Sequence, residues 1–179
     1  MRPETIALHA GYQPDDQHAV AVPIHQTTSY AFDDAQHAAD LFDLKVKGNI
    51  YSRIMNPTCA VLEERLAALD GGIAALATAT GMAAITYAIQ TIAQAGDNII
   101  SISELYGGTY NLFAHTLPRQ DIEVRFHDKD DFAAIEAAVD ARTRAIYCES
   151  IGNPSGSVAD IERLADIAHR NGLPLMVDN

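Results

Sequence analysis

Short apolar segments alternate with longer helical stretches over most of the chain. Residues 73–78, 98–102, 122–126, 144–149 and 173–177 are short and apolar, which is typical of buried strands. Residues 82–94, 109–117, 132–139 and 161–170 carry apolar side chains at helical spacing. This alternation predicts parallel strands joined by helical crossovers, with helices on both faces of the sheet. We therefore expect an α/β fold of the doubly wound class.

Residues 1–50 lack this alternation. They contain scattered aromatic residues, Pro14, Pro23 and polar turns, with one helical stretch around residues 33–46. This pattern predicts an extended arm with one helix, not an independent core. Directly after it, an amphipathic helix is expected to begin at Pro57 and to end at the glycine pair, with apolar side chains at helical spacing: Val61, Leu62, Leu66 and Leu69.

Charge and composition exclude several classes of function. The chain has 12 Lys and Arg against 24 Asp and Glu, a formal charge of -12, which repels nucleic-acid phosphates. No apolar run approaches the roughly 20 residues that span a bilayer, and the N-terminus lacks the layout of a signal peptide. Cys59 and Cys148 belong to no CxxC motif and are expected to be free thiols. We therefore expect a cytoplasmic protein, and the spacing of the histidines indicates no metal site.

Residues that follow predicted strands are the ones to examine, because ligands of such sheets bind beyond the carboxyl ends of the strands. Gly81 follows residues 73–78 and opens a helix, so free N–H groups and the helix dipole favour an anion there. A phosphate cradle and a simple tight turn both fit this feature. The segment matches neither GxGxxG nor GxxxxGK[ST], which leaves a nucleotide site as a weaker alternative.

Three further side chains follow the later strands. Tyr106 stands beside two glycines and can either stack on a planar cofactor or cap the core. Asn153 precedes a proline that favours an extended backbone, and it suits either a ligand contact or a plain turn. Asp178 ends a strand that we expect to be buried, where a carboxylate needs a partner. That partner is a protonated pyridine nitrogen, a helix N-terminus or a metal ion.

Together these segments resemble the Cys/Met-metabolism family of pyridoxal-phosphate (PLP) enzymes. The segments that carry the resemblance are 8–11, 23–29, 51–58, 80–84, 105–109, 149–154 and 177–179, in the family's order and spacing. Within the family, residues 36–42, 48–51, 106–113 and 149–154 are typical of the O-acetylhomoserine sulfhydrylases. Gly108 stands where methionine γ-lyases usually carry Cys. Thr80 replaces the commoner Ser, and Met82 stands where the sulfhydrylases often have Gln.

The resemblance implies fold type I, pyridoxal 5'-phosphate as cofactor and a role for each of the quoted residues. Gly81 and Met82 would bind the cofactor phosphate through backbone N–H groups. Tyr51 and Arg53 would reach the same phosphate from a neighbouring subunit, which implies a homodimer, usually paired into a tetramer. The arm of residues 1–50 would contact that neighbour, and residues 51–179 would form the first part of the PLP-binding domain.

The resemblance also assigns the groups around the cofactor ring. Tyr106 would stack on the ring and act as the catalytic acid or base. Asn153 would contact the ring oxygen or the substrate carboxylate, and Asp178 would keep the ring nitrogen protonated, so that the ring accepts electrons.

The family's Schiff-base lysine and substrate-binding arginine would lie beyond residue 179, so the chain is expected to be the N-terminal part of such an enzyme. Lys45, Lys47 and Lys129 do not lie in the expected motif. The implied reaction is γ-replacement, in which O-acetyl-L-homoserine and sulfide give homocysteine and acetate in methionine biosynthesis. Methionine γ-lyase, O-succinylhomoserine sulfhydrylase and cystathionine γ-synthase or lyase stay open within the family. A non-catalytic fragment and a nucleotide-binding module stay open outside it.

Overall fold

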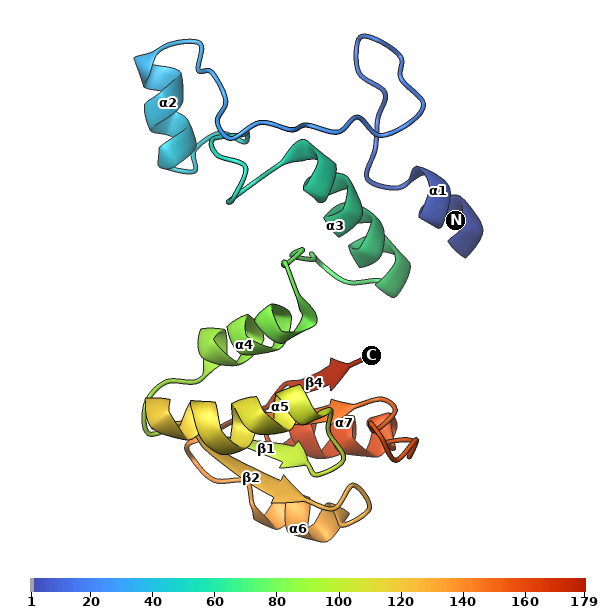
Figure 1. Cartoon of the computed structure of the whole chain (residues 1–179), viewed down its shortest axis with the longest axis vertical. Coiled ribbons are helices and arrows are strands. Elements are labelled where there is room, and N and C mark those ends of the chain that lie inside the picture. The colour runs from blue at the N-terminus through green and yellow to red at the C-terminus, as the bar shows by residue number, and fades with distance from the viewer. Residues whose placement is uncertain (1) are drawn as a thin grey trace. The chain divides into compact units, whose positions relative to one another are not determined.

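A computed structural model describes residues 2–179 and divides into two compact units, Met1–Ala77 and Thr78–Asn179. The first unit contains three helices: α1 (Pro3–His9), α2 (Ala35–Phe42) and α3 (Pro57–Asp70). The second contains the β-sheet and the remaining helices (Figure 1). Each unit is described by itself below.

The first unit confirms two predicted helices and adds one. Helix α2 lies within the predicted stretch 33–46 and is capped by Asp34, whose carboxylate accepts the N–H of His37. Helix α1 was not predicted, because this short segment has no apolar repeat. It begins at Pro3 and packs on α3. Gly11 follows α1 with a φ of +75°, a conformation that favours glycine. A Cβ at this position would lie 2.7 Å from the carbonyl oxygen of Val61 in α3, so only glycine fits there.

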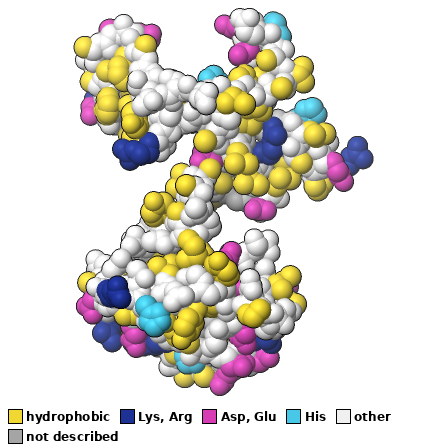
Figure 2. Space-filling view, in the orientation of Figure 1, with side chains coloured by type: hydrophobic (Ala, Val, Ile, Leu, Met, Phe, Trp, Pro, Cys, Tyr) yellow, Lys and Arg dark blue, Asp and Glu magenta, His cyan; other side chains and the backbone are white. Residues whose placement is uncertain are grey.

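Helix α3 begins and ends where the sequence indicates. The side chain of Asn56 accepts the N–H of Thr58, and Gly71 closes the helix in the left-handed conformation at a φ of +67°. No residue of α3 is buried within this chain. Its leucines are exposed, and hydrophobic side chains gather over this region in Figure 2.

The predicted strand over residues 73–78 is wrong. This segment is irregular, and it pairs with no strand in the part of the chain that the structure describes. Ile73 and Leu76 are largely exposed, and the N–H of Ala77 donates to the Glu63 carboxylate at 2.8 Å instead of to a neighbouring strand. Apolar composition alone does not make a strand, because a strand also needs a hydrogen-bonding neighbour.

The second unit contains a four-stranded sheet in the order β2-β1-β3-β4, in which all pairings are parallel. Its strands are β1 (Asn98–Ile102), β2 (Glu123–His127), β3 (Thr143–Glu149) and β4 (Leu175–Asp178), within two residues of the predictions at each end. Every residue of β1 is buried. Because successive side chains of a strand point to opposite faces, both faces of the sheet centre are covered. The predicted α/β class with a parallel sheet is confirmed.

Helices α4 (Gly81–Ile92), α5 (Gly107–Asn111), α6 (Phe132–Ala137) and α7 (Ile161–Arg170) follow the predicted segments. The helix predicted over 109–117 begins two residues earlier and continues after α5 as a π-helical turn, Leu112–Thr116, and a 3-10 turn, Leu117–Gln120. Polar side chains cap three of these helices: Thr80 before α4, Asp131 before α6 and Asp160 before α7.

The order of the strands determines where a ligand can bind. From β1 the chain moves to one side to form β2, returns to the other side of β1 to form β3, and continues outward to β4. The direction therefore reverses between β1 and β3. Open parallel sheets leave a crevice beyond the carboxyl ends of the strands at such a reversal. The segments that follow Ile102 and Glu149 flank this crevice.

A polar network binds the opposite, amino-terminal edge of the strands together. Asp140 accepts hydrogen bonds from the side chain of Asn98 and the backbone of Arg142, and it pairs with Arg125 at 3.0 Å. The hydroxyl of Thr143 donates to the amide oxygen of Asn98 at 2.8 Å. These contacts link β1, β2 and β3 at an edge remote from the crevice.

Several sequence expectations concern the chain as a whole. Cys59 and Cys148 are free thiols, as expected. Burial raises the pKa of the Cys148 thiol to about 11. Across residues 2–179, no helix combines the length and the apolar character needed to cross a membrane. In the same range, no cluster of His, Cys, Asp or Glu is arranged to hold a metal ion.

Candidate active site

A cavity of about 550 Å³ lies in the second unit at the carboxyl ends of β1, β3 and β4. Five predicted site residues line it together: Gly81, Met82, Tyr106, Asn153 and Asp178. The remaining lining residues are Thr80, Ile85, Thr109, Glu149, Ser150, Ile151 and Asn179. Tyr51 and Arg53 belong to the first unit, so the cavity of the second unit does not contain them.

The N-terminus of α4 opens into this cavity. The hydroxyl of Thr80 accepts the N–H of Ala83 at 3.0 Å, which satisfies one of the N–H groups that a helix leaves unpaired at its start. The N–H groups of Gly81 and Met82 precede it in the same turn. A Cβ on Gly81 would meet nothing within 4 Å. The backbone at Gly81 is thus open to a ligand, and the helix dipole favours an anionic one.

Tyr106 is positioned by a hydrogen bond to β3 and by the space that Gly108 leaves open. Its N–H donates to the Oε1 atom of Glu149 at 2.6 Å. A Cβ on Gly108 would lie 2.6 Å from Cε1 of Tyr106 and 3.2 Å from the sulfur of Met82. The absence of a side chain at Gly108 therefore lets the Tyr106 ring take its place beside Met82, where it lines the cavity.

Asp178 lines the same cavity from the end of β4. The phenol of Tyr147 donates to its Oδ2 atom at 3.2 Å. The expectation that Asp178 ends a buried strand is wrong, because both Val177 and Asp178 are exposed. β4 is the edge strand of the sheet, so residues 2–179 provide β3 as its only neighbour.

Glu149 stands at the position of β3 that pairs with Asp178. It is 5% exposed, and sequence reasoning quoted it within a motif without assigning it a role. The available signal was its place as the last residue of an apolar segment, which is where a parallel sheet presents groups to a ligand. A carboxylate is rarely buried without a partner. The burial of Glu149 therefore indicates that its carboxylate binds a specific partner.

The loop after β3 closes one wall of the cavity. Its ends are joined by the bridge between Ile151 and Val158, and the backbone of Ser150 donates to the carbonyl of Asp178 at 2.9 Å. Asn153 lies in this loop before a cis peptide bond to Pro154, and its side chain borders the cavity. The sequence predicted this proximity, and the hydrogen bonds of the loop maintain it.

A smaller adjoining cavity of about 200 Å³ links the two ends of the site. Gly81, Ile85 and Asp178 line both cavities, whereas Tyr147 and Met176 line only the smaller one. The start of α4 and the end of β4 therefore face common space. This is the arrangement required if one small ligand contacts both groups.

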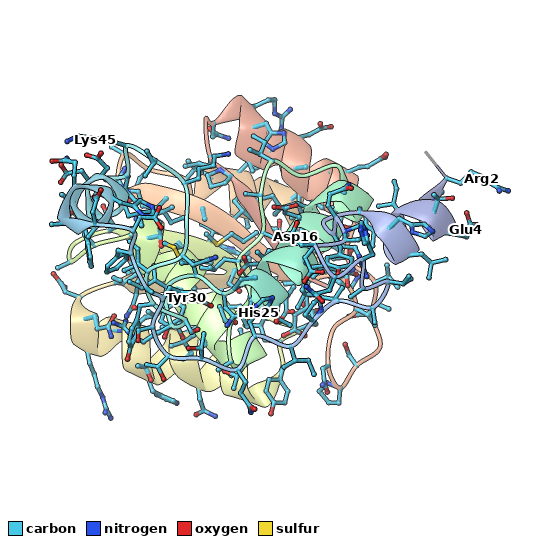
Figure 3. All side chains as sticks on the ribbon, turned by 90° about the horizontal axis from the view of Figure 1, so that it is seen from above. Arg2, Glu4, Asp16, His25, Tyr30 and Lys45 are labelled. Carbon is cyan, nitrogen blue, oxygen red and sulfur yellow. The ribbon has the colours of Figure 1, made fainter. Side chains whose placement is uncertain are left out.

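Tyr51 and Arg53 lie together in the first unit. The Arg53 guanidinium carbon is 5.6 Å from the centre of the Tyr51 ring. Tyr51 forms a bridge with Ser29, and the side-chain amide of Asn56 donates to the carbonyl of His25 at 2.9 Å. Figure 3 labels His25 and Tyr30 on the arm that these bonds hold. The turn between Tyr51 and Asn56 is thus tied to the preceding segment.

The groups around the cavity define the chemistry of a suitable ligand. Free N–H groups and a helix dipole at Gly81 favour an anion. The ring of Tyr106 offers an aromatic face. The carboxylates of Glu149 and Asp178 favour a positive charge or an N–H donor at the other end. A planar heterocycle with a phosphate on one side and a protonated nitrogen on the other meets these requirements.

Comparison with known proteins agrees with this chemistry. A family model described as Cys/Met metabolism PLP-dependent enzyme matches residues 4–179. A homocysteine synthase of Schizosaccharomyces pombe is 54% identical over 98% of this chain. An O-acetyl-L-homoserine sulfhydrylase of Thermus thermophilus is 56% identical over the whole chain. The chain spans 41% and 43% of the length of these two relatives, respectively.

Two solved structures are similar to this chain. One, from Campylobacter jejuni, is described as an O-acetylhomoserine (thiol)-lyase with a pyridoxyl-lysine phosphate, and it is 43% identical. It matches all of this chain and 44% of its own with a TM-score of 0.97, which confirms the fold type I class. An O-acetylhomoserine sulfhydrylase of Wolinella succinogenes matches 69% of this chain and 36% of its own, with 47% identity and a TM-score of 0.67.

Proposed function

This chain belongs to the family of Cys/Met metabolism PLP-dependent enzymes, and on this premise we propose that it forms part of an O-acetyl-L-homoserine sulfhydrylase. The protein replaces the acetate of O-acetyl-L-homoserine with sulfide and releases homocysteine and acetate. The observation that carries this proposal is the common cavity of Gly81, Tyr106 and Asp178. The names of the relatives at 54% and 56% identity support the choice of substrate.

The residues of the cavity fit pyridoxal 5'-phosphate. Gly81 and Met82 would hold the phosphate through their backbone N–H groups, and the open space beside Gly81 would admit it. Tyr106 would stack on the ring, Asn153 would contact the ring oxygen or the substrate carboxylate, and Asp178 would bind the ring nitrogen. When bound with its nitrogen protonated, the cofactor supplies an electron sink for the bonds that break next to the substrate's amino group.

The chain's own residues orient the reactants and move protons. Asp178 would keep the ring nitrogen protonated, because a nearby carboxylate favours the protonated form. Tyr106 would act as acid or base near the substrate. Lys129 pairs with Asp130 at 2.6 Å, and neither Lys45, Lys47 nor Lys129 lines the cavity. We propose that none of the three forms the Schiff base.

The test uses the protein expressed from the full reading frame that contains this sequence. We expect a visible absorption band that borohydride abolishes, because borohydride reduces a PLP–lysine imine. A protein without that band would contradict PLP binding and would favour a nucleotide-binding module or a non-catalytic assembly role. Titration with ATP, followed by calorimetry, separates these two outcomes.

The reaction is tested by comparing substrates at equal concentration. We expect homocysteine from O-acetyl-L-homoserine with sulfide, and slower turnover of O-succinyl-L-homoserine. Release of methanethiol and α-ketobutyrate from methionine alone, without replacement activity, would instead identify a methionine γ-lyase. Turnover of cystathionine would indicate a cystathionine γ-lyase, and its formation from cysteine and an O-acylhomoserine would indicate a cystathionine γ-synthase.

We further propose a homodimer, paired into a tetramer, in which each site receives Tyr51 and Arg53 from the neighbouring subunit. Residues 1–50 form an arm on that neighbour, and residues 51–179 begin the PLP-binding domain. The hydrogen bonds of Asn56 support this proposal, because they fix the turn that presents Arg53. The free thiols agree with action in the cytoplasm, a reducing compartment.

The shared site is tested by mixing two inactive variants, Arg53→Ala and Asp178→Asn, after reversible dissociation. A mixed dimer contains one site with both defects and one intact site. Random pairing then restores about one quarter of the wild-type activity, because half of the dimers are mixed. No recovery, with mixed dimers verified by native mass spectrometry, would show that Arg53 serves its own subunit.

A further inference from the structure

Tyr147 lies on β3 and contacts a proposed cofactor residue without lining the main cavity. It precedes Glu149 by two residues, so both side chains point to the same face of the sheet. It is 3% exposed, and its phenol donates to the Oδ2 atom of Asp178 at 3.2 Å. Asp178 lines the main cavity, whereas Tyr147 lines only the smaller one behind it.

The ring of Tyr147 is fixed by packing. Phe113 is fully buried and meets it edge to face, with ring centres 4.8 Å apart and an interplanar angle of 80°. Burial and the nearby Asp178 carboxylate raise the pKa of Tyr147 far above its ordinary value. The phenol therefore keeps its proton over the whole range in which proteins are stable. It stays a donor from a fixed position.

Within residues 2–179, Asp178 is the last residue of β4 and stands beside Glu149 of β3. In residues 2–179, the contact with Tyr147 is the one side-chain hydrogen bond that Asp178 makes, and it uses Oδ2. This leaves Oδ1 for a ligand in the cavity.

We propose that Tyr147 is a positioning residue, which holds Oδ2 of Asp178 so that Oδ1 meets the ring nitrogen of the cofactor. The inference rests on the proposed function. Without the phenol, the carboxylate loses the donor that fixes Oδ2, and its contact with the ring nitrogen would be weakened. A hydrogen bond to a charged group of this kind corresponds to a change of about tenfold or more in an equilibrium constant.

The test is the Tyr147→Phe variant of the protein expressed from the full reading frame. Phenylalanine keeps the ring and its contact with Phe113 and removes only the hydroxyl. We expect the affinity for PLP to fall about tenfold, and the kcat to fall similarly with little change in KM. Tyr87→Phe is the matched control, because Tyr87 is 56% exposed and lines neither cavity, and we expect it to match the wild type.

A spectroscopic readout separates positioning from a structural role. With PLP labelled by 15N in the ring, the nitrogen chemical shift reports protonation directly. We expect Tyr147→Phe to shift this signal toward the unprotonated form and Tyr87→Phe to leave it unchanged. A wild-type shift and affinity in Tyr147→Phe would overturn the proposal. Loss of the imine band in the wild type would instead contradict the proposed function itself.

A double-mutant cycle tests whether Tyr147 acts through Asp178. In the Asp178→Asn background, Tyr147→Phe is expected to change neither the 15N shift nor the PLP affinity further. Additive effects would overturn the proposal. If Tyr147→Phe does not fold, Tyr147→Gln and Tyr147→Leu replace it. Gln and Leu are similar to each other in size, but only the Gln side chain has an N–H donor. The proposal then requires a more protonated nitrogen in the Gln variant, and equal shifts would contradict it.

Discussion

Glu149 and Asp178 occupy paired positions on the neighbouring parallel strands β3 and β4, at the edge where both strands end. Paired residues of adjacent strands lie about 4.8 Å apart along the hydrogen-bonding direction and point to the same face. Two carboxylates at this spacing repel each other unless a donor or a cation lies beside them. Tyr106 supplies a donor to Glu149 and Tyr147 supplies one to Asp178. The pair still favours a positively charged ligand.

The first prediction concerns the buried carboxylate of Glu149. Glu149→Ala leaves the N–H of Tyr106 without its acceptor and opens a space beside it. We expect the free energy of unfolding to fall by about 1 to 3 kcal/mol. We also expect weaker PLP binding, because the Tyr106 turn loosens. Urea denaturation and PLP titration measure the two effects.

Glu136→Ala is the control for this experiment. Glu136 pairs with Arg170 at 3.1 Å, and both side chains are largely exposed. Exposed pairs of this kind contribute about 0 to 1 kcal/mol. An equal loss of stability in the two variants would mean that burial of Glu149 has no special effect.

Gly81→Ala tests the proposed phosphate site. The added Cβ meets no atom of the chain within 4 Å, so the stability of the protein should be unchanged. It would occupy the space through which a phosphate approaches the backbone. We expect PLP affinity to fall by about tenfold or more, since hydrogen bonds to charged groups are worth about 1.5 to 3 kcal/mol. Equilibrium dialysis of PLP measures the change.

Gly72→Ala is the control for Gly81→Ala. A Cβ at Gly72 would make contacts no closer than 3.8 Å, and Gly72 lines neither the main cavity nor the smaller one. We expect unchanged affinity in this variant. If Gly81→Ala also bound PLP like the wild type, the phosphate would have to lie elsewhere.

Much of the site could be predicted, because the side chains with suitable chemistry stand directly beside predicted strands and helices in the sequence. Tyr106 and Asn153 follow β1 and β3, Asp178 ends β4, and a parallel sheet with a reversal of direction brings such positions together. Gly81 was predicted from its place at the start of a helix, although residues 73–78 form no strand. The prediction of a strand over residues 73–78 was wrong. The composition of this segment is typical of a strand, but strand formation also depends on a neighbouring strand, which no local pattern specifies.

Contacts between residues that are far apart in the sequence could not be predicted. The bond between Tyr147 and Asp178 joins residues 31 positions apart, and it depends on the register of β3 and β4. From the sequence alone, Tyr147 could not be distinguished from the other apolar residues of its strand.

Gly108 is expected to control the position of Tyr106. In Gly108→Ala the new Cβ would lie 2.6 Å from Cε1 of the tyrosine, so the exposed ring must move. We expect normal stability, because the ring can rotate into solvent, but a changed circular dichroism of the bound cofactor. Tyr106→Ala should produce a similar change. An unaltered cofactor signal in Gly108→Ala, with a normal signal in Gly107→Ala as well, would contradict a stacked Tyr106.

The network at the amino-terminal edge of the strands predicts a dependence on pH. The Asn98 side chain, the Arg142 backbone and Arg125 lower the pKa of Asp140 well below its ordinary value of about 3.9. A carboxylate with a lowered pKa stabilises the folded protein above its unfolded pKa, and this contribution is lost as the pH falls. The wild type should therefore begin to lose thermal stability below about pH 5, and the loss should continue as the pH falls through the lowered pKa of Asp140.

Asp140→Asn should be less stable than the wild type at neutral pH and should lose less on acidification. The melting temperature of the apoprotein, measured across this range, checks both expectations. Asp130→Asn is the control, because the Asp130 side chain is 70% exposed and its carboxylate pairs with Lys129. If the melting temperatures of the wild type and Asp140→Asn changed with pH in the same way, Asp140 would not be a cause of the pH dependence.

The last prediction concerns Asp178, on which the electron sink depends. Asp178→Asn keeps the size of the side chain and a hydrogen-bonding oxygen for Tyr147, so the fold should be retained. An amide cannot hold the ring nitrogen protonated as a carboxylate does. We expect PLP still to bind, and kcat for homocysteine formation to fall by about 100-fold or more, the scale of losing one electrostatic contact at a reacting centre. Asp166→Asn is the matched control, because Asp166 is exposed on α7 and lines neither the main cavity nor the smaller one. If Asp178→Asn turned over O-acetyl-L-homoserine as fast as this control, the carboxylate would not serve the ring nitrogen.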